Sequence, residues 1–377
     1  MSAPTVPTRG RPARPRRWVP AARLPGTPLA AVAAVAALVA CTTIAGCGRR
    51  PRIEGAPPDT AHVAIADSTT RLLRDAQAGW EGGGGDAAAH ASAAALLADL
   101  RARPGDAWED RARALLDSLA IGAEIASARG VLAVNFFSRA DPDAGSWPYL
   151  YWSDGKQARL QPIEGTGLHL LAAVVRGGGE SAAGVALVMG RRAGGGQQPL
   201  VMTWSHPRAT ASWTLAQTLG PDSLGGIGTA EFQAVTDSSA DLVARTYTGA
   251  RGFDECAMCP HIYRTRRFHW GAAGFARVQD AEVASPYATF VKFVQALVAG
   301  DNDGAALRVV NGDLLDRARR LEWNRARGLW RVAPDTDESA QQMVFFRGKD
   351  EAYRVDFAAR GADWVIAGFE PTTRSVE

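Results

Sequence analysis

The cysteines are the side chains of this 377-residue sequence whose spacing most directly suggests chemistry. Cys256 and Cys259 are separated by two residues, and His261 follows closely. Cys41 and Cys47 form a second group near the N-terminus. A Cys-x-x-Cys pair can form a disulfide, bind zinc, act as a redox couple or remain as two free thiols.

We expect a disulfide between Cys256 and Cys259, because the N-terminal segment indicates export to a compartment that is often oxidising. A structural zinc site needs four ligands, and only His261 and His269 could complete one. A thioredoxin-like couple lowers a cysteine pKa at a helix N-terminus, whereas strand-like residues flank this pair. Haem attachment needs histidine directly after the second cysteine, where Pro260 stands. Two free thiols remain the last alternative.

The other short motifs favour turns and caps over catalysis. Ser153-Asp-Gly-Lys156 matches a Ser-x-x-Lys spacing, but it separates strand-like runs and predicts a hairpin turn. Asp301-Asn-Asp303-Gly304 lacks the remaining ligands of a calcium loop and predicts a helix cap. The glycine runs at 177–179 and 225–228 do not have the spacing of a phosphate-binding loop. We therefore expect no cofactor, and a binding or structural module rather than an enzyme.

The N-terminal segment has the pattern of a secretory signal. Residues 1–27 are polar, proline-rich and basic, and residues 29–40 are uninterrupted apolar chain. About a dozen apolar residues are too few to span roughly 30 Å of hydrocarbon as a helix. An uncleaved transmembrane anchor is the alternative interpretation.

Ile44-Ala45-Gly46-Cys47 ends this segment and resembles the lipobox of bacterial lipoproteins. The resemblance implies a signal peptide over residues 1–47 and a diacylglycerol on the sulfur of Cys47. Leu38-Val39-Ala40-Cys41 fits the same pattern, so Cys41 is the alternative lipidated residue. Residues 48–60 are rich in proline and charge and predict a solvated tether. The residue after Cys47 is Gly48, whereas the inner-membrane retention signal of Gram-negative lipoproteins has Asp there. In a Gram-negative cell this favours a location on the periplasmic face of the outer membrane.

The resemblance makes a membrane the first expected partner, since two or more acyl chains anchor a protein stably. An envelope protein or a small apolar ligand is the second expected partner. Nucleic acid is not expected. The formal net charge is +3, and much of its excess arginine lies before residue 53 rather than on the remaining chain.

The sequence after residue 60 predicts an α+β fold. Residues 61–128 are alanine-rich with leucines at helical spacing, and a turn signal at 103–106 predicts a helical hairpin. Residues 130–280 contain short apolar runs between glycine- and aspartate-rich turns, which predict an antiparallel β-rich domain built as a sandwich, barrel or partial propeller. A faint repeat relates residues 151–161 to residues 269–279.

Residues 285–377 predict a small separate α+β domain. Ser285 and Pro286 are good N-cap and first-turn residues for a helix with an apolar stripe over 287–298. Strands are expected at 341–347, 351–359 and 363–369. This order resembles the cone-shaped fold of the ketosteroid-isomerase-like and nuclear-transport-factor-like families.

The cone resemblance implies an interior pocket, so a small-ligand carrier or an enzyme is the alternative function. Asp316, Tyr353 and Asp356 are the polar side chains that could line such a pocket.

Overall fold

The computed structural model has the predicted α+β class, with seven helices and sixteen strands among the described residues. It describes residues 60–373 except 84, 104–106, 143–144, 154–155, 166, 178–183, 194, 207–211, 272 and 335. The predicted signal peptide, Cys41, Cys47 and the tether up to residue 59 lie outside the described residues. Within the described part, every helix is too short or too polar to cross a membrane.

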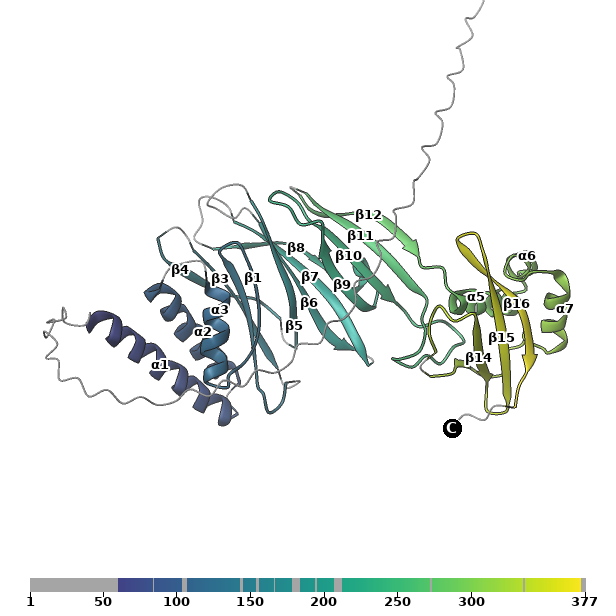
Figure 1. Cartoon of the computed structure of the whole chain (residues 1–377), viewed down its shortest axis with the longest axis horizontal. Helices are drawn as coiled ribbons and strands as arrows, with labels where there is room; N and C mark the ends of the chain where they lie inside the picture. The colour runs from purple at the N-terminus through teal and green to yellow at the C-terminus, as the bar shows by residue number, and fades with distance from the viewer. Residues whose placement is uncertain are drawn as a thin grey trace, which may run out of the picture. The chain divides into compact units, whose positions relative to one another are not determined.

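Three helices cover one face of the first sheet (Figure 1). They are α1 (Thr60–Glu81), α2 (Gly85–Ala102) and α3 (Trp108–Ser118). Their buried leucines, including Leu73, Leu96 and Leu116, share one cluster with Phe136 and Tyr151 of the sheet. The helices therefore owe their position to apolar burial on a sheet face, because alanine-rich helices have little else to hold them in place.

The helical segment expected over 61–128 is wrong at its C-terminal end. The helices end at Ser118, and Gly122–Ala128 is strand β1, paired antiparallel with β2 (Val131–Phe137). Arg129 and Gly130 both have positive φ, as a two-residue hairpin turn of type I′ requires. Alanine content suggests a helix, but pairing with an apolar neighbouring strand overrides that local preference.

Twelve strands form three successive four-stranded antiparallel sheets. The first contains β1, β2, β3 (Ser146–Ser153) and β4 (Ala158–Pro162). The second contains β5 (His169–Arg176), β6 (Gly184–Ala193), β7 (Gly196–Ser205) and β8 (Thr214–Leu219), followed by the short helix α4 (Pro221–Leu224). The third contains β9 (Ile227–Gln233), β10 (Asp241–Tyr247), β11 (Tyr263–Gly271) and β12 (Gly274–Glu282).

The second sheet is buried on both faces. Val185 and Leu187 of β6 pack with the first sheet, whereas Ala186 and Val188 of the same strand pack with the third. Side chains alternate between the faces of a strand, so burial on both sides explains why β6 is almost continuously apolar. The free face of the third sheet carries polar residues such as Glu231 and Arg267.

A repeated side-chain contact joins the last strands of successive sheets. The Gln161 amide in β4 accepts from the Trp213 backbone N–H at 2.9 Å and donates to its carbonyl at 3.0 Å. In the same way, the Gln217 amide in β8 accepts from the Phe275 N–H at 2.7 Å and donates to its carbonyl at 3.0 Å. Each glutamine thereby satisfies both backbone groups of one residue in the next sheet. We call these two contacts the glutamine clamps.

The C-terminal elements enclose a core of their own. The helices are α5 (Pro286–Ala299), α6 (Asn302–Ala306) and α7 (Gly312–Arg320). The fourth sheet has the order β13 (Trp330–Val332), β14 (Gln342–Arg347), β15 (Glu351–Arg360) and β16 (Asp363–Pro371). The predicted start of α5 is confirmed, because Ser285 is its N-cap and accepts from the Ala288 N–H.

Candidate functional site

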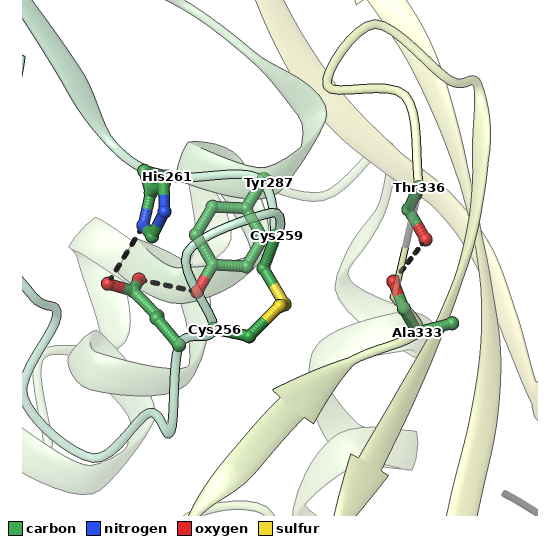
Figure 2. The surroundings of a disulfide bond; sticks show 7 residues. Cys256, Cys259, His261, Tyr287, Ala333 and Thr336 are labelled. Carbon is green, nitrogen blue, oxygen red and sulfur yellow. Dashed lines mark hydrogen bonds and ion pairs between the residues drawn. A yellow bond between two sulfur atoms is a disulfide. The ribbon is translucent and has the colours of Figure 1, made fainter. Parts of the chain in front are cut away.

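The Cys-x-x-Cys motif lies in the loop 248–262, which connects β10 to β11. Cys256 and Cys259 form a disulfide, with a sulfur–sulfur distance of 2.08 Å (Figure 2). A backbone bond from the Cys259 N–H to the Cys256 carbonyl closes the turn. We call residues 248–262 the disulfide loop.

The disulfide loop belongs to the core of the C-terminal elements, although it precedes them in the sequence. Phe253 and Cys259 are members of that buried cluster. Phe253 forms a parallel bridge with Trp330 of β13, and backbone bonds join Trp330 to Gly252 and to Asp254 at 3.0 and 2.8 Å. The loop is therefore fixed by packing and backbone pairing as well as by its sulfur bridge.

The two sulfur-bearing residues differ in exposure. Cys256 is exposed, whereas only 8% of Cys259 is accessible. Between them, Ala257 is exposed and Met258 is 75% accessible, which makes Met258 an unusually exposed large apolar side chain. The tip of the disulfide loop thus presents Cys256, Ala257 and Met258 to solvent, whereas Cys259 is buried.

A buried polar network connects the disulfide loop to helix α5. The Glu255 side chain is only 5% exposed. Its carboxylate accepts from the Tyr287 hydroxyl of α5 at 2.6 Å and from the Ala250 N–H at 3.2 Å, and it lies 3.3 Å from Nδ1 of His261. A buried carboxylate needs such partners to remain ionised.

The network shifts the acidities of its members. Burial by itself would raise the pKa of Glu255, but hydrogen bonds from His261, Tyr287 and Ala250 outweigh it and lower that pKa below its ordinary value. Burial, together with the bond to Glu255, raises the pKa of the Tyr287 hydroxyl far above its usual range. Glu255 is therefore the anionic member of the network, and Tyr287 is a permanent donor.

His261 completes the network and leaves one ring nitrogen without a partner. Its side chain is 2% exposed, and its ring stacks on Tyr247 with centroids 3.5 Å apart and planes inclined by 8°. Nδ1 faces Glu255, and Nε2 has no hydrogen-bond partner among the described residues. A histidine held by a carboxylate through one nitrogen can give or take a proton at the other.

The four proposed zinc ligands are not brought together. His261 lies in the disulfide loop with Cys256 and Cys259, whereas His269 lies near the far end of β11, opposite Asp241. Nδ1 of His269 is 2.9 Å from the Asp241 carboxylate. The reason is the extended conformation of β11, which carries the chain away from the loop. Among the described residues, no group of three or more metal-ligating side chains is assembled.

Two motifs set aside as turns and caps take ordinary structural positions. Asp301 is the N-cap of α6, and its side chain accepts from the Gly304 N–H at 2.8 Å, which confirms the predicted helix cap. Ser153 ends β3, and Lys156 lies in the connection to β4. These positions place the motifs in structural connections.

The residues considered for a pocket in the C-terminal elements do not converge. Asp316 is exposed and pairs with Arg319 at 3.1 Å, and Asp356 accepts from Gln342 at 2.6 Å on the outside of the sheet. Tyr353 is buried, but its hydroxyl donates to Glu351. Aromatic rings fill the interior between the helices and the sheet: Phe290, Phe293, Trp323, Trp330, Phe345, Tyr353 and Phe369.

A cavity of about 400 Å³ lies at the surface of these elements, outside the aromatic core. Charged and polar side chains contribute to its lining, including Lys292, Arg308 and Arg360. Lys292 also pairs with Glu282 at the end of β12. A ligand at this position would meet charged side chains beside apolar ones, such as Leu307 and Trp364.

A second polar constellation, which the sequence did not reveal, joins the first two sheets. The Glu124 carboxylate of β1 accepts from Asn135 at 2.9 Å and from the Leu170 N–H at 2.6 Å, and it lies 2.9 Å from Nδ1 of His169. Asn135 also donates to the Leu168 carbonyl at 2.6 Å. Glu124 and His169 line an open cleft of about 750 Å³.

The Glu124 network has a clear structural role. Residues 168–170 carry the chain from the first sheet into the second, where an irregular register between Leu170 and Ala172 interrupts regular strand pairing. The side chains of Glu124 and Asn135 satisfy the backbone groups at that crossing. No sequence spacing links these residues, because they come from β1, β2 and β5.

Comparisons with known proteins add no assignment. No protein-family model and no curated protein matches the chain. Among solved structures, the crystal structure of Saccharomyces cerevisiae Sqt1 aligns with 65% of this chain and 61% of that chain, with 10% sequence identity and a TM-score of 0.19. The matched region thus spans less than two thirds of that protein's chain, and a similarity this low carries no argument about fold or function.

Proposed function

We propose that the protein is an exported bacterial envelope lipoprotein, held at a membrane by acyl chains on Cys47, whose folded part is a non-catalytic binding or structural module. The observation that carries the proposal is the sequence Ile44-Ala45-Gly46-Cys47 after a basic segment and a short apolar run. On this proposal the first helix, α1, begins thirteen residues after the anchor (60 minus 47). The intervening tether of proline and charged residues would keep the folded part next to the bilayer.

The proposal includes a cellular location. An exported lipoprotein whose second residue is Gly48 would be sorted to the outer membrane in a Gram-negative cell and would face the periplasm. The Cys256–Cys259 disulfide is compatible with such a compartment, because disulfides persist in the periplasm and are rare in the cytosol. The expected partners are the membrane itself and an envelope protein or a small ligand.

Metabolic labelling with a palmitate analogue tests the anchor. We expect the wild-type chain and a Cys41→Ser variant to incorporate the label, and a Cys47→Ser variant to lose it. Label retained by Cys47→Ser and lost by Cys41→Ser would move the anchor to Cys41. A wild-type chain that remains unlabelled, in the cytosol and at its full unprocessed mass, would contradict the proposal.

The alternative function, a small-ligand carrier or enzyme using an interior pocket of residues 285–377, has less support. The aromatic side chains of that region pack against one another, for example Phe290 on Phe345 with centroids 3.7 Å apart. A carrier would need to use the surface cavity near Lys292 and Arg308 instead. A separate α+β domain over residues 285–377, and its resemblance to the cone-shaped fold, are proposals about how the chain is organised. They do not by themselves support ligand binding.

A further inference from the structure

We propose that the Cys256–Cys259 disulfide is a reactive site that oxidises the dithiol of a partner protein, with the sulfur of Cys256 as the atom attacked. This inference does not depend on membrane anchoring. It adds to the proposed binding module a stoichiometric thiol exchange, in which each disulfide reacts once. It rests on the unequal exposure of the two cysteines, on the apolar tip between them and on the buried network beneath them.

The unequal exposure of Cys256 and Cys259 determines which of the two a partner thiolate attacks. Thiol–disulfide exchange begins when a thiolate attacks one sulfur in line with the bond, so the attacked sulfur must be accessible. Cys256 is exposed and Cys259 is 8% accessible within an apolar cluster. A partner thiolate can therefore reach Cys256, and Cys259 is the sulfur that leaves.

The tip of the disulfide loop offers a contact surface for a protein rather than for a small thiol. Ala257 and Met258 flank the accessible sulfur and are both exposed. Methionine is flexible and polarizable, and it adapts to varied apolar surfaces. A partner segment that carries two cysteines among apolar residues fits this tip.

The reaction balances as a two-electron transfer. The first partner thiolate forms a bond to the sulfur of Cys256 as the Cys256–Cys259 bond breaks, and Cys259 leaves as a thiolate that takes up a proton. The second partner thiol then loses its proton and attacks the first partner sulfur. Cys256 leaves as a thiolate and is protonated. The loop ends as a dithiol, and the partner ends with one disulfide.

The buried network adjoins the disulfide through Glu255, which directly precedes Cys256 in the chain. In Figure 2, dashed lines join His261 and Tyr287 to one carboxylate, which is that of Glu255. Glu255 holds Nδ1 of His261, while Nε2 is buried and unpartnered within the described residues. We regard His261 as a positioning residue, because no contact between its ring and a sulfur atom defines it as catalytic.

The disulfide is one of several constraints on the position of the disulfide loop. Several contacts of the loop involve neither sulfur: Phe253 lies in the core, the backbone of Trp330 bonds to the loop, and Glu255 accepts from Tyr287. These contacts would hold the geometry of the reduced loop.

Thiol trapping tests the proposal on the full chain with Cys41 and Cys47 changed to Ser, which leaves the pair as its only cysteines. We expect dithiothreitol to reduce the pair in the native protein. We also expect Cys259→Ser to form a mixed disulfide with glutathione disulfide about tenfold faster than Cys256→Ser, because only an accessible thiolate reacts readily. Equal rates for the two variants, or a disulfide that resists reduction until the protein unfolds, would overturn the proposal.

The variant Met258→Asp tests the contact surface. Because Met258 is exposed, we expect this substitution to leave the fold intact. We expect it to slow reduction by a synthetic Leu-Cys-Gly-Gly-Cys-Leu peptide several-fold, and to leave reduction by dithiothreitol unchanged. An equal effect on both reductants, or no effect on either, would contradict a role for the tip. Palmitate labelling tests the proposed anchor at Cys47 and does not involve the Cys256–Cys259 pair. Failure of one proposal is therefore distinguishable from failure of the other.

Discussion

Removal of one hydroxyl group tests whether the network beneath the disulfide loop stabilises the fold. Tyr287 is 1% exposed, and its hydroxyl donates to the buried Glu255 carboxylate at 2.6 Å. A hydrogen bond to a charged group contributes about 1.5–3 kcal/mol. Phenylalanine keeps the ring, which stacks on Phe345, and removes only the donor. We expect Tyr287→Phe to lower the free energy of unfolding by about 2 kcal/mol.

Urea unfolding followed by tryptophan fluorescence measures this loss, because Trp323 and Trp330 lie in the same core. The denaturant dependence should keep its slope, so that the midpoint alone reports stability. A double-mutant cycle with Glu255→Gln isolates the pair, and we expect a coupling energy of at least about 1 kcal/mol. Strict additivity, or a loss for Tyr287→Phe below about 0.5 kcal/mol, would refute the reasoning.

The pH dependence provides a second check. The pKa of Glu255 is lowered in the folded protein, so the ionised carboxylate stabilises the fold above its unfolded pKa. That stabilisation is lost as the pH falls through the lowered, folded pKa. The difference in stability between wild type and Tyr287→Phe should therefore shrink at acid pH, once Glu255 is protonated. A difference that stays constant across this range would show that the hydroxyl contributes packing rather than a charge-assisted bond.

Three further changes test other parts of the fold, each by the same urea assay. Glu124→Ala leaves the Leu170 N–H without its acceptor and should cost about 2 kcal/mol, whereas Glu124→Gln should cost less because an amide oxygen can still accept. Gln217→Ala removes two bonds to the Phe275 backbone and should cost about 1–2 kcal/mol, and a change within about 0.3 kcal/mol would mean that water replaces the clamp. Replacing both cysteines of the disulfide loop by serine should cost about 2 kcal/mol, the loop entropy of a four-residue ring, and an unchanged midpoint would contradict this value.

The local features of the fold could be predicted where a short stretch of sequence fixes the geometry. Ser285 and Pro286 define the start of α5, and Asp301 caps α6, because each cap depends on residues within one turn. The faint repeat between 151–161 and 269–279 also has a structural counterpart. It relates the β3–β4 hairpin to the β11–β12 hairpin, which are the third and fourth strands of their sheets.

The candidate site could be predicted only in part. The spacing of Cys256 and Cys259 indicates a bond. Nothing in the sequence links Glu255 to Tyr287, which lies 32 positions later and belongs to the apolar stripe predicted for its helix. Similarly, β1 has the composition of a helix and becomes a strand through pairing with β2. Both features depend on tertiary contacts between separate elements, and such contacts produce no periodic pattern of residues in the local sequence.

The glutamine clamps have a consequence for how this fold can change in evolution. Gln161 and Gln217 bind backbone groups, which every residue except proline offers in the same form. The hydrogen bonds of each clamp are therefore independent of the side chain at the clamped position, while the buried side chains of Trp213 and Phe275 contribute packing separately. Duplication or deletion of an entire unit could preserve the joint, so relatives with two or four such units would be able to assemble by the same rule.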